Sequence, residues 1–199
     1  MPGVNDEGGS GDNMFFSWTL GNAHFVSMNS ETAIDTANFT DYEMEWVAAD
    51  LKKVDRALTP FVVANFHRPM YCSNDGQCGG YADHLKDSAE DIFYENGVDV
   101  VIAGHVHEYE RTLPVYKGQT MGADYNSPSA PSYFLQGASG NREGNKGSIP
   151  EDTADWSAAI FNEVCLAIMK ITTSSIDWTY YSVPEGNVMV ELDHAVITK

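Results

Sequence analysis

Three histidines stand where they could bind metal ions. His105 and His107 are one residue apart in the string GHVHEYER, which directly follows the apolar run VDVVIA. His67 follows a second apolar run, FVVANF. Imidazole is the commonest metal ligand in proteins and suits both zinc and iron. The pattern therefore predicts a metal centre that contains His67, His105 and His107.

The alternative is a structural role, because a single histidine at a strand end more often forms hydrogen bonds with its surroundings than binds a metal. His24 and His194 lie in strand-like segments and are interpreted in this way. In a regular strand, His105 and His107 would point to opposite faces, so both reach one centre only if the chain bends. We expect Gly104 to permit that bend, with each imidazole bound to one of two metals about 4 Å apart.

The elements that position these histidines read as a strand, a helix and a strand. Residues 61–66 and 98–103 are apolar runs typical of strands that are covered on both faces. Between them, residues 84–97 predict a helix that ends at Gly97. A crossover of this kind makes the two strands parallel, so His67 and His105 fall at the carboxyl edge of the sheet, where open α/β sheets bind their ligands.

The flanking segments complete a mixed α/β pattern. Residues 14–31 predict a hairpin that turns at a Gly-Asn pair, and residues 41–58 predict an amphipathic helix with Asp41 as its N-cap. Residues 132–137 read as a further strand, and the segment from Phe161 onward reads as consecutive antiparallel strands. The expected fold is a βαβ core followed by a β meander.

Composition narrows the classes of function. The 199 residues, 43% of them hydrophobic, can form one domain over residues 1–199, and residues 1–13 read as a flexible N-terminal segment. The 11 Lys and Arg against 29 Asp and Glu give a net charge of −18, which argues against nucleic acid as a partner. No apolar run approaches the roughly 20 residues that cross a membrane. If an acidic protein acts on a phosphate-containing substrate, bound metal ions are needed to neutralise the charge of the phosphate.

The cysteines and one glycosylation sequon indicate in which cellular compartment the protein is found. Cys72 and Cys78 enclose the short loop CSNDGQC, and their spacing is compatible with a disulfide and with two reduced thiols. Cys165 has no nearby partner in the sequence. Asn38 begins the one glycosylation sequon, Asn-Phe-Thr. Together these features favour an oxidising compartment, so the expected location is secreted, lysosomal or vacuolar.

Several strings resemble the C-terminal part of the purple acid phosphatases, members of the metallophosphoesterase superfamily: GHVHEYER, FHRPMYCSN, FFSWTLGNAHFVSMNSE and SAPSYFLQGASGNREG. The resemblance covers nearly the whole chain. It implies a layered αββα sandwich that hydrolyses phosphate monoesters at acid pH, with a metal-activated hydroxide at a dinuclear centre of Fe(III) and a divalent metal (Fe, Zn or Mn). By motif, His67 and His105 match the ligands of the divalent metal, and His107 matches a ligand of the iron.

The sequence departs from this family at the carboxylate ligands. The family site also contains an Asp in a GD motif, a second Asp followed closely by a Tyr, and a GNHE motif. Here GD occurs only at Gly11 and Asp12, and GNH is absent. Because Fe(III) needs anionic oxygen ligands, we expect the chain to lack the N-terminal βαβ part of the fold and to show little activity alone.

Two alternatives remain open at this point. The chain could be a non-catalytic remnant, or a one-metal binding module that needs a partner chain. It could also cleave phosphodiester or pyrophosphate bonds, as other branches of the superfamily do. An exposed sheet edge left by missing strands would promote association, so a homodimer fits either case.

Further candidates surround the histidines. The resemblance places His84 where plant relatives carry histidines that approach the substrate phosphate, and the alternative is a surface residue at a helix start. Arg68 could bind an anionic oxygen of the substrate or pair with a carboxylate. Glu110 and Arg111 could pair with each other or support the histidine loop, and Tyr109 could support it by packing or by a phenolic hydrogen bond.

Overall fold

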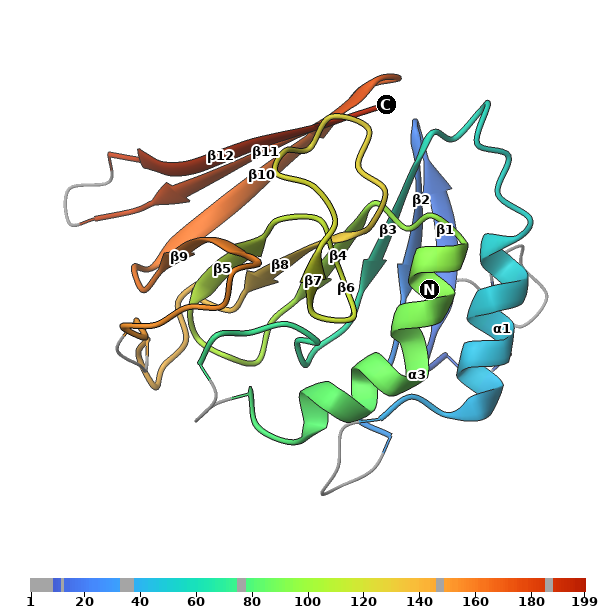
Figure 1. The fold of residues 1–199 in the computed structure, drawn as a ribbon, viewed down its shortest axis with the longest axis horizontal. Coiled ribbons are helices and arrows are strands. Elements are labelled where there is room, and N and C mark those ends of the chain that lie inside the picture. The colour runs from blue at the N-terminus through green and yellow to red at the C-terminus, as the bar shows by residue number, and fades with distance from the viewer. Residues whose placement is uncertain (1–8, 12, 33–37, 75–77, 146–148, 185–187) are drawn as a thin grey trace.

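A seven-stranded mixed sheet forms the centre of the fold (Figure 1). The structure is a computed structural model and describes residues 9–11, 13–32, 38–74, 78–145, 149–184 and 188–199. The strands of the central sheet are β1 (Phe16–Leu20), β2 (Ala23–Ser27), β3 (Phe61–Asn65), β4 (Val100–Ala103), β5 (Tyr109–Thr112), β8 (Ser132–Gln136) and β9 (Ser157–Phe161). Their order across the sheet is β1-β2-β3-β4-β8-β5-β9.

The remaining elements form the outer layers and one small hairpin. A second sheet contains β10 (Cys165–Ile171), β11 (Ser175–Ser182) and β12 (Val190–Thr198), all antiparallel as expected. The helices are α1 (Asp41–Leu51) and α3 (Tyr81–Glu95), and a short hairpin contains β6 (Val115–Tyr116) and β7 (Gln119–Thr120).

The predicted βαβ unit is present. Strands β2, β3, β4 and β8 run parallel to one another, and β3 leads through α3 into the adjacent β4. The expected hairpin is β1 paired antiparallel with β2. Gly97 follows α3 with a φ of +64°, the left-handed conformation that commonly ends a helix at a glycine. The two carboxyl strand ends that precede His67 and His105 are therefore neighbours.

Both faces of the central sheet are buried. On one face, α1 and α3 pack Val47 and Phe93 against Val62 and Val101 of the sheet. On the other, the second sheet packs Trp178 and other residues against Phe61, Phe134 and their neighbours. The resulting helix, sheet and sheet layers (Figure 1) agree with three layers of the expected αββα sandwich. Among the described residues, no helix covers the outer face of the second sheet.

Helix α1 is shorter than predicted. It begins after Thr40, whose hydroxyl accepts a hydrogen bond from the Glu43 backbone, so Thr40 rather than Asp41 is the N-cap. The helix ends at Leu51, and Leu58 is exposed. The apolar spacing continues to Leu58, but Asp55 closes a turn there: its side chain accepts from the Ala57 backbone and its carbonyl from the Leu58 backbone. This local side-chain bond competes with the helix.

Strands β5 and β9 were not predicted from the sequence. Strand β5 contains Glu110 and Arg111, and both are buried. Charged residues in a segment of four normally indicate a loop, because a buried charge is costly unless it is paired or hydrogen-bonded. Here the partners come from distant parts of the chain, so the local pattern could not reveal a strand.

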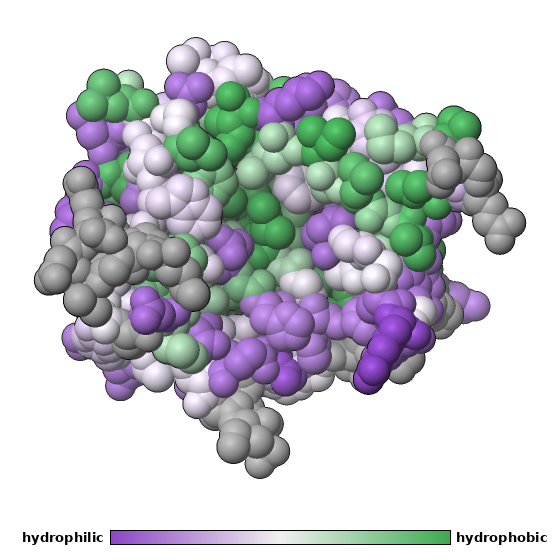
Figure 2. Space-filling model, turned by 180° about the vertical axis from the view of Figure 1, so that it is seen from behind, coloured by the Kyte–Doolittle hydropathy of each residue, from purple (hydrophilic) through white to green (hydrophobic). Residues whose placement is uncertain are grey.

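The surface carries a broad apolar area. Figure 2 shows apolar residues gathered across the upper part of the rear face, with hydrophilic residues along its lower part. The large hydrophobic residues that are exposed include Trp18 and Leu20 on β1, Ile168 on β10 and Val196 on β12. None of the described helices combines the length and the hydropathy needed to cross a bilayer. Of the expected N-terminal segment, residues 1–8 and 12 lie outside the described residues.

Candidate metal centre

The ends of β3 and β4 bring His67 and His105 into contact. Backbone pairing continues past both strands, since the Phe66 N–H donates to the Ile102 carbonyl (3.1 Å) and the Gly104 N–H donates to the His67 carbonyl (2.8 Å). The Nδ1 atom of His105 then lies 3.1 Å from Nε2 of His67. Their ring centroids are 4.9 Å apart. The two imidazoles thus converge at the carboxyl edge of the sheet, as predicted.

The bend after β4 occurs at His105 itself. Its φ is +67°, a left-handed conformation that few non-glycine residues adopt, whereas Gly104 does not have a positive φ. The expectation that Gly104 provides the bend was therefore wrong. The turn continues through hydrogen bonds from the Val106 N–H to the Gly104 carbonyl and from the Glu108 N–H to the Val106 carbonyl, both 2.8 Å. Strained backbone of this kind often marks a functional site.

Gly137 permits the turn to approach strand β8. A Cβ atom built on Gly137 would lie 1.7 Å from the carbonyl oxygen of Val106. The Gly137 N–H also donates to the Glu108 carbonyl at 3.0 Å. No other residue type fits so close to a backbone carbonyl without displacing it. The side chain of Val106 is buried beside Leu135, which holds the turn against the sheet.

Three residues surround the histidine pair on the solvent side. The ring of Tyr81, the first residue of α3, meets His105 edge to face with centroids 5.7 Å apart. The guanidinium of Arg68 lies 5.0 Å from the centre of the Tyr81 ring. Arg68 Nε donates to Glu31 Oε1 at 2.8 Å, so Arg68 forms the carboxylate pair that was one of its two predicted roles. This pair lies at the rim of the histidine site.

Burial and nearby charges shift the pKa values of three groups at this site. Burial, then the charge of Arg68 and the proximity of His67, lowers the pKa of His105, which keeps its imidazole neutral and able to bind a cation. Burial also raises the pKa of Tyr81 to about 12, so the phenol stays protonated. Partial burial acts to raise the pKa of Glu31, but the hydrogen bond and charge of Arg68 outweigh it and lower that pKa.

His107 lies outside the close contact between His67 and His105, although its charge contributes to the lowered pKa of His105. It is half-buried, two residues beyond His105. Within the described parts of the chain, the one group of three potential ligands whose atoms lie within 4.8 Å of one another is Cys72, Glu108 and Glu110. The structure therefore brings His67 and His105 together, and the role of His107 as a metal ligand stays a prediction.

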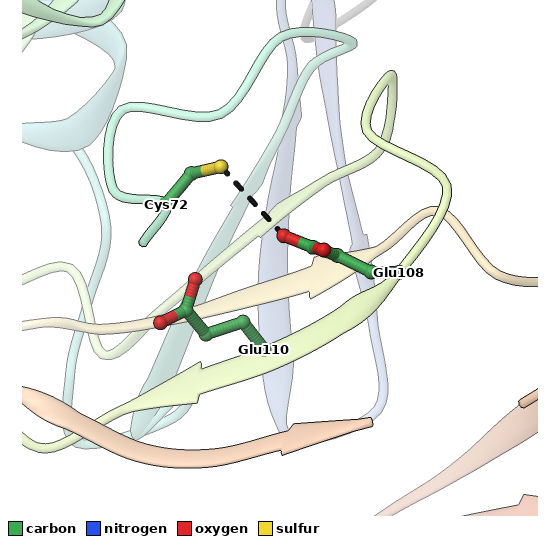
Figure 3. Close-up of side chains that lie close together, drawn as sticks. All are labelled: Cys72, Glu108 and Glu110. Atoms are coloured by element: carbon green, nitrogen blue, oxygen red, sulfur yellow. Dashed lines mark hydrogen bonds between the residues drawn. The ribbon is translucent and has the colours of Figure 1, made fainter. Parts of the chain in front are cut away.

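The group of Cys72, Glu108 and Glu110 does not form a second metal site. Cys72 and Cys78 form a disulfide, so the Cys72 sulfur is not a thiolate. It lies 3.9 Å from Oε1 of Glu108 (Figure 3). Burial raises the pKa of Glu108 to about 7; the charge of Glu110 adds to that effect, and an Asn74 hydrogen bond opposes it. Glu110 instead accepts hydrogen bonds from the Ser73 backbone and hydroxyl and from the Ser157 hydroxyl.

Glu110 and Arg111 do not pair with each other. Adjacent strand residues point to opposite faces, so Glu110 faces the loop after β3 while Tyr109 and Arg111 face the second sheet. Arg111 binds both carboxylate oxygens of Asp193, at 2.6 and 2.7 Å, and the Tyr109 hydroxyl donates to the same carboxylate. The predicted Glu110–Arg111 pair is therefore wrong. Support of the histidine loop by Tyr109, Glu110 or Arg111 stays a prediction.

The other predicted residues lie away from the histidine pair. His84 is exposed on α3 and borders a pocket that also contains Asn38, the exposed sequon residue. The Oδ1 atom of Asn38 accepts a hydrogen bond from the Ser88 hydroxyl. His24 contacts Asp50, and His194 contacts Asp177. Cys165 is a buried free cysteine.

The two imidazole nitrogens are spaced to bind the same divalent ion, as the resemblance implies. Two imidazole nitrogens bound to one tetrahedral zinc ion are about 3.3 Å apart, given bonds of about 2.05 Å. The nitrogens of His67 and His105 are 3.1 Å apart, which is close to that separation. A ferric ion needs anionic oxygen ligands, and within the described residues no group of three ligands contains these histidines and a carboxylate.

Sequence reasoning missed three residues of this region. Tyr81 was placed outside the predicted helix, and Glu31 was assigned to the end of the hairpin. Only the folded chain shows that Tyr81 contacts His105 and that Glu31 pairs with Arg68. Gly137 carried a usable signal, because a glycine directly after a strand often marks a close approach of two backbones.

The chain is similar to a known protein family, to curated proteins and to solved structures. The family model described as calcineurin-like phosphoesterase matches residues 4–109, more than half of the chain. Purple acid phosphatase 18 of Arabidopsis thaliana is 32% identical over 179 residues, which cover 88% of this chain and 38% of that protein. Acid phosphatase type 7 of Danio rerio is 32% identical over 177 residues, 75% of this chain and 39% of that protein.

The chain therefore spans about two fifths of the length of these two curated relatives. Among solved structures, a purple acid phosphatase named PPD1, isolated from yellow lupin (Lupinus luteus) seeds, superposes with a TM-score of 0.79 at 20% identity. The match covers 92% of this chain and 32% of that one. At this level of identity it is the fold that is shared.

Proposed function

Because the chain belongs to the calcineurin-like phosphoesterase family, we propose that it acts on phosphate monoesters with a divalent metal ion held by His67 and His105. The observation that carries this proposal is the 3.1 Å approach of the two imidazole nitrogens at the carboxyl edge of the sheet. The names of the curated relatives, purple acid phosphatase and acid phosphatase, support a monoester substrate.

The roles of the residues follow from their positions. His67 and His105 bind the ion through the nitrogens that face each other, and the left-handed backbone of His105 sets the direction of its ring. A bound divalent ion supplies a positive charge for phosphoryl oxygens and lowers the pKa of a water molecule. Arg68 uses its Nε to bind Glu31. Arginine has further N–H donors on its guanidinium, and these could bind an anionic oxygen of the substrate.

The sequence also predicted a second metal with His107 as a ligand. The described residues do not add support for it. The buried carboxylates that follow His107 in the sequence, Glu108 and Glu110, contact the disulfide and two serine hydroxyls. We therefore propose one divalent ion, iron, zinc or manganese, for this chain. Turnover by the chain alone is expected to be slow, because one cation offsets less phosphoryl charge than two.

The test is hydrolysis of 4-nitrophenyl phosphate and bis(4-nitrophenyl) phosphate with chelator, with Zn²⁺, with Fe and with Mn²⁺. We expect slow, metal-dependent turnover that prefers the monoester and is lost in His105→Ala. No difference between metal and chelator would favour a non-catalytic metal-binding module instead. A preference for the diester would favour a phosphodiesterase. Fast turnover would contradict the expectation that the chain alone is a poor catalyst.

The location and association state are also proposals. The disulfide between Cys72 and Cys78 supports an oxidising compartment, such as a secreted, lysosomal or vacuolar location. The exposed hydrophobic residues of β1, β10 and β12 support a homodimer. Glycosidase treatment of protein from a secretory host would test Asn38 as a glycosylation site. Sedimentation of the purified chain would test the dimer.

A further inference from the structure

A second pocket lies at the opposite edge of the central sheet from the histidine pair. It has a volume of about 460 Å³ and is bordered by the β1–β2 hairpin and by α1 and the turn that follows it. His24, one of its lining residues, lies near the amino end of β2, next to the start of β3. Because β2 and β3 are parallel, this is the edge farthest from the carboxyl ends that carry His67 and His105.

Three side chains in this pocket form a continuous chain of hydrogen bonds. Thr19 and His24 are directly opposite each other in the hairpin, and the Thr19 hydroxyl lies 3.0 Å from His24 Nδ1. The other nitrogen, Nε2, lies 2.8 Å from Oδ2 of Asp50 on α1. His24 and Asp50 are buried, whereas Thr19 is exposed. The hydroxyl thus sits where a ligand in the pocket can reach it.

The directions of these hydrogen bonds follow from the chemistry of the groups. A carboxylate can only accept a hydrogen bond, so Asp50 fixes the proton of a neutral His24 on Nε2. Nδ1 then carries the lone pair and accepts the hydrogen of the Thr19 hydroxyl. A hydroxyl that donates to an imidazole, which in turn donates to a carboxylate, is the arrangement that activates a nucleophile in acyl transfer.

A fourth residue adds a possible hydrogen-bond donor. Ser17 precedes Thr19 by two residues on β1, so the two side chains share one face of the hairpin. Ser17 is 1% exposed, and its Oγ has no hydrogen-bond partner among the residues that the structure describes. Buried hydroxyls are normally satisfied. An oxygen atom of a ligand in this pocket would satisfy Ser17.

We propose that this pocket is an acyl-transfer site that accepts carboxylic esters, with Thr19 as nucleophile, His24 as general base and Asp50 as the residue that orients His24. The Thr19 oxygen forms a bond to the ester carbonyl carbon, and its proton moves to His24 Nδ1. The Ser17 hydroxyl donates to the carbonyl oxygen as negative charge develops there. The carbon–oxygen bond to the leaving alcohol breaks, and the alcohol takes the proton from His24. Water then releases the acid from Thr19 by the same route, which regenerates the hydroxyl.

This activity needs no metal, so it can be separated from phosphate ester hydrolysis. The probe is 4-nitrophenyl acetate, used with the whole chain in the presence of a chelator. We expect a burst of 4-nitrophenol of at most one per chain, and an acetyl group on Thr19 in peptide mass spectra. Thr19→Val keeps the shape and removes the hydroxyl, and it should lower the burst rate about 100-fold. Thr19→Ser should retain it.

The matched control is Thr120→Val, which removes an exposed strand hydroxyl on β7. It should leave the burst unchanged, and thermal unfolding should show that all three variants are folded. The proposal is overturned if Thr19→Val reacts as fast as the wild type, or if the acetyl group is found on other residues and not on Thr19. Absence of any burst above the rate in buffer would overturn it as well.

Discussion

At the scale of single residues, the turn that carries the histidines depends on a glycine in a neighbouring strand end. The Val106 carbonyl occupies the space where any other residue at position 137 would place its Cβ. Gly137→Ala must therefore displace the turn, and we expect it to lower the free energy of unfolding by about 2 to 3 kcal/mol and to weaken metal binding. Urea unfolding and zinc titration would measure both effects.

Gly104→Ala is the matched control for that variant. A Cβ at Gly104 would lie 3.8 Å from the His67 carbonyl, an ordinary contact, and its φ is not positive. The alanine should change the free energy of unfolding by less than about 1 kcal/mol. A larger effect at Gly104 than at Gly137 would contradict the position of the bend at His105.

Glu108 should make stability depend on pH. Burial of the side chain raises its pKa in the folded protein from the ordinary value of 4.5 to about 7. The folded state therefore holds its proton more tightly than the unfolded state does. Its stabilising contribution is full below pH 4.5 and is lost as the pH rises through about 7.

The variant Glu108→Gln removes this titration. Relative to the wild type, it should gain on the order of 3 kcal/mol between pH 4.5 and pH 8, measured by chemical unfolding with chelator present. Glu95→Gln, at an exposed position on α3, should show no comparable change. If the difference between wild type and Glu108→Gln is the same at both pH values, Glu108 titrates normally in the folded protein.

At the scale of elements, the start of α1 is set by Thr40. Its hydroxyl accepts from the Glu43 backbone N–H, one of the donors that a helix leaves unpaired at its first turn. Thr40→Ala should lower the free energy of unfolding by about 1 kcal/mol, and Thr40→Ser should restore most of it. Asp41→Ala should cost less, because Asp41 contributes through the helix dipole and does not cap the helix. A larger loss of stability in Asp41→Ala than in Thr40→Ala would identify Asp41 as the N-cap.

The elements differ in how well the sequence predicted them. The βαβ unit and the hairpin were predictable because apolar spacing and turn residues are local signals. Strand β5 was not, because the charge of Arg111 is compensated in the buried strand by Asp193, 82 residues away. The bend at His105 was likewise assigned to the wrong residue, Gly104, because the assignment used the local sequence alone. The preference of glycine for unusual backbone is a local rule, and here the surrounding structure holds a histidine in that conformation.

At the scale of the whole molecule, one buried ion pair joins the two sheets. Arg111 of β5 and Asp193 of β12 are about one tenth exposed, and Arg111 also hydrogen-bonds to Tyr125. Removing one partner leaves a buried charge without compensation. Asp193→Asn should therefore lower the free energy of unfolding by about 3 kcal/mol. Thermal and urea unfolding would measure it.

An exposed ion pair in the second sheet serves as the control for Asp193→Asn. His194 and Asp177 form an exposed contact on β12 and β11. Asp177→Asn should change the free energy of unfolding by less than about 1 kcal/mol, because exposed ion pairs contribute little. Equal effects of Asp193→Asn and Asp177→Asn would show that the buried pair does not hold the sheets together.

The family resemblance predicted from the sequence is confirmed at this scale, since both the family model and the curated relatives agree with it. The strings GHVHEYER and FHRPMYCSN carried enough local information to identify the family. They did not reveal how many metals bind, because that number depends on which carboxylates lie beside the histidines in space. In the structure, Glu108 and Glu110 contact Cys72, Ser73 and Ser157 instead.

The most direct measurement of the central claim is the number and affinity of metal ions bound by the whole chain. Titration with Zn²⁺ followed by calorimetry, with elemental analysis of the dialysed protein, should give one ion per chain. His67→Ala and His105→Ala should each weaken binding by about 100-fold or more, and His194→Ala should leave it unchanged. Unchanged affinity in both ligand variants, or two tightly bound ions in the wild type, would contradict the single site at His67 and His105.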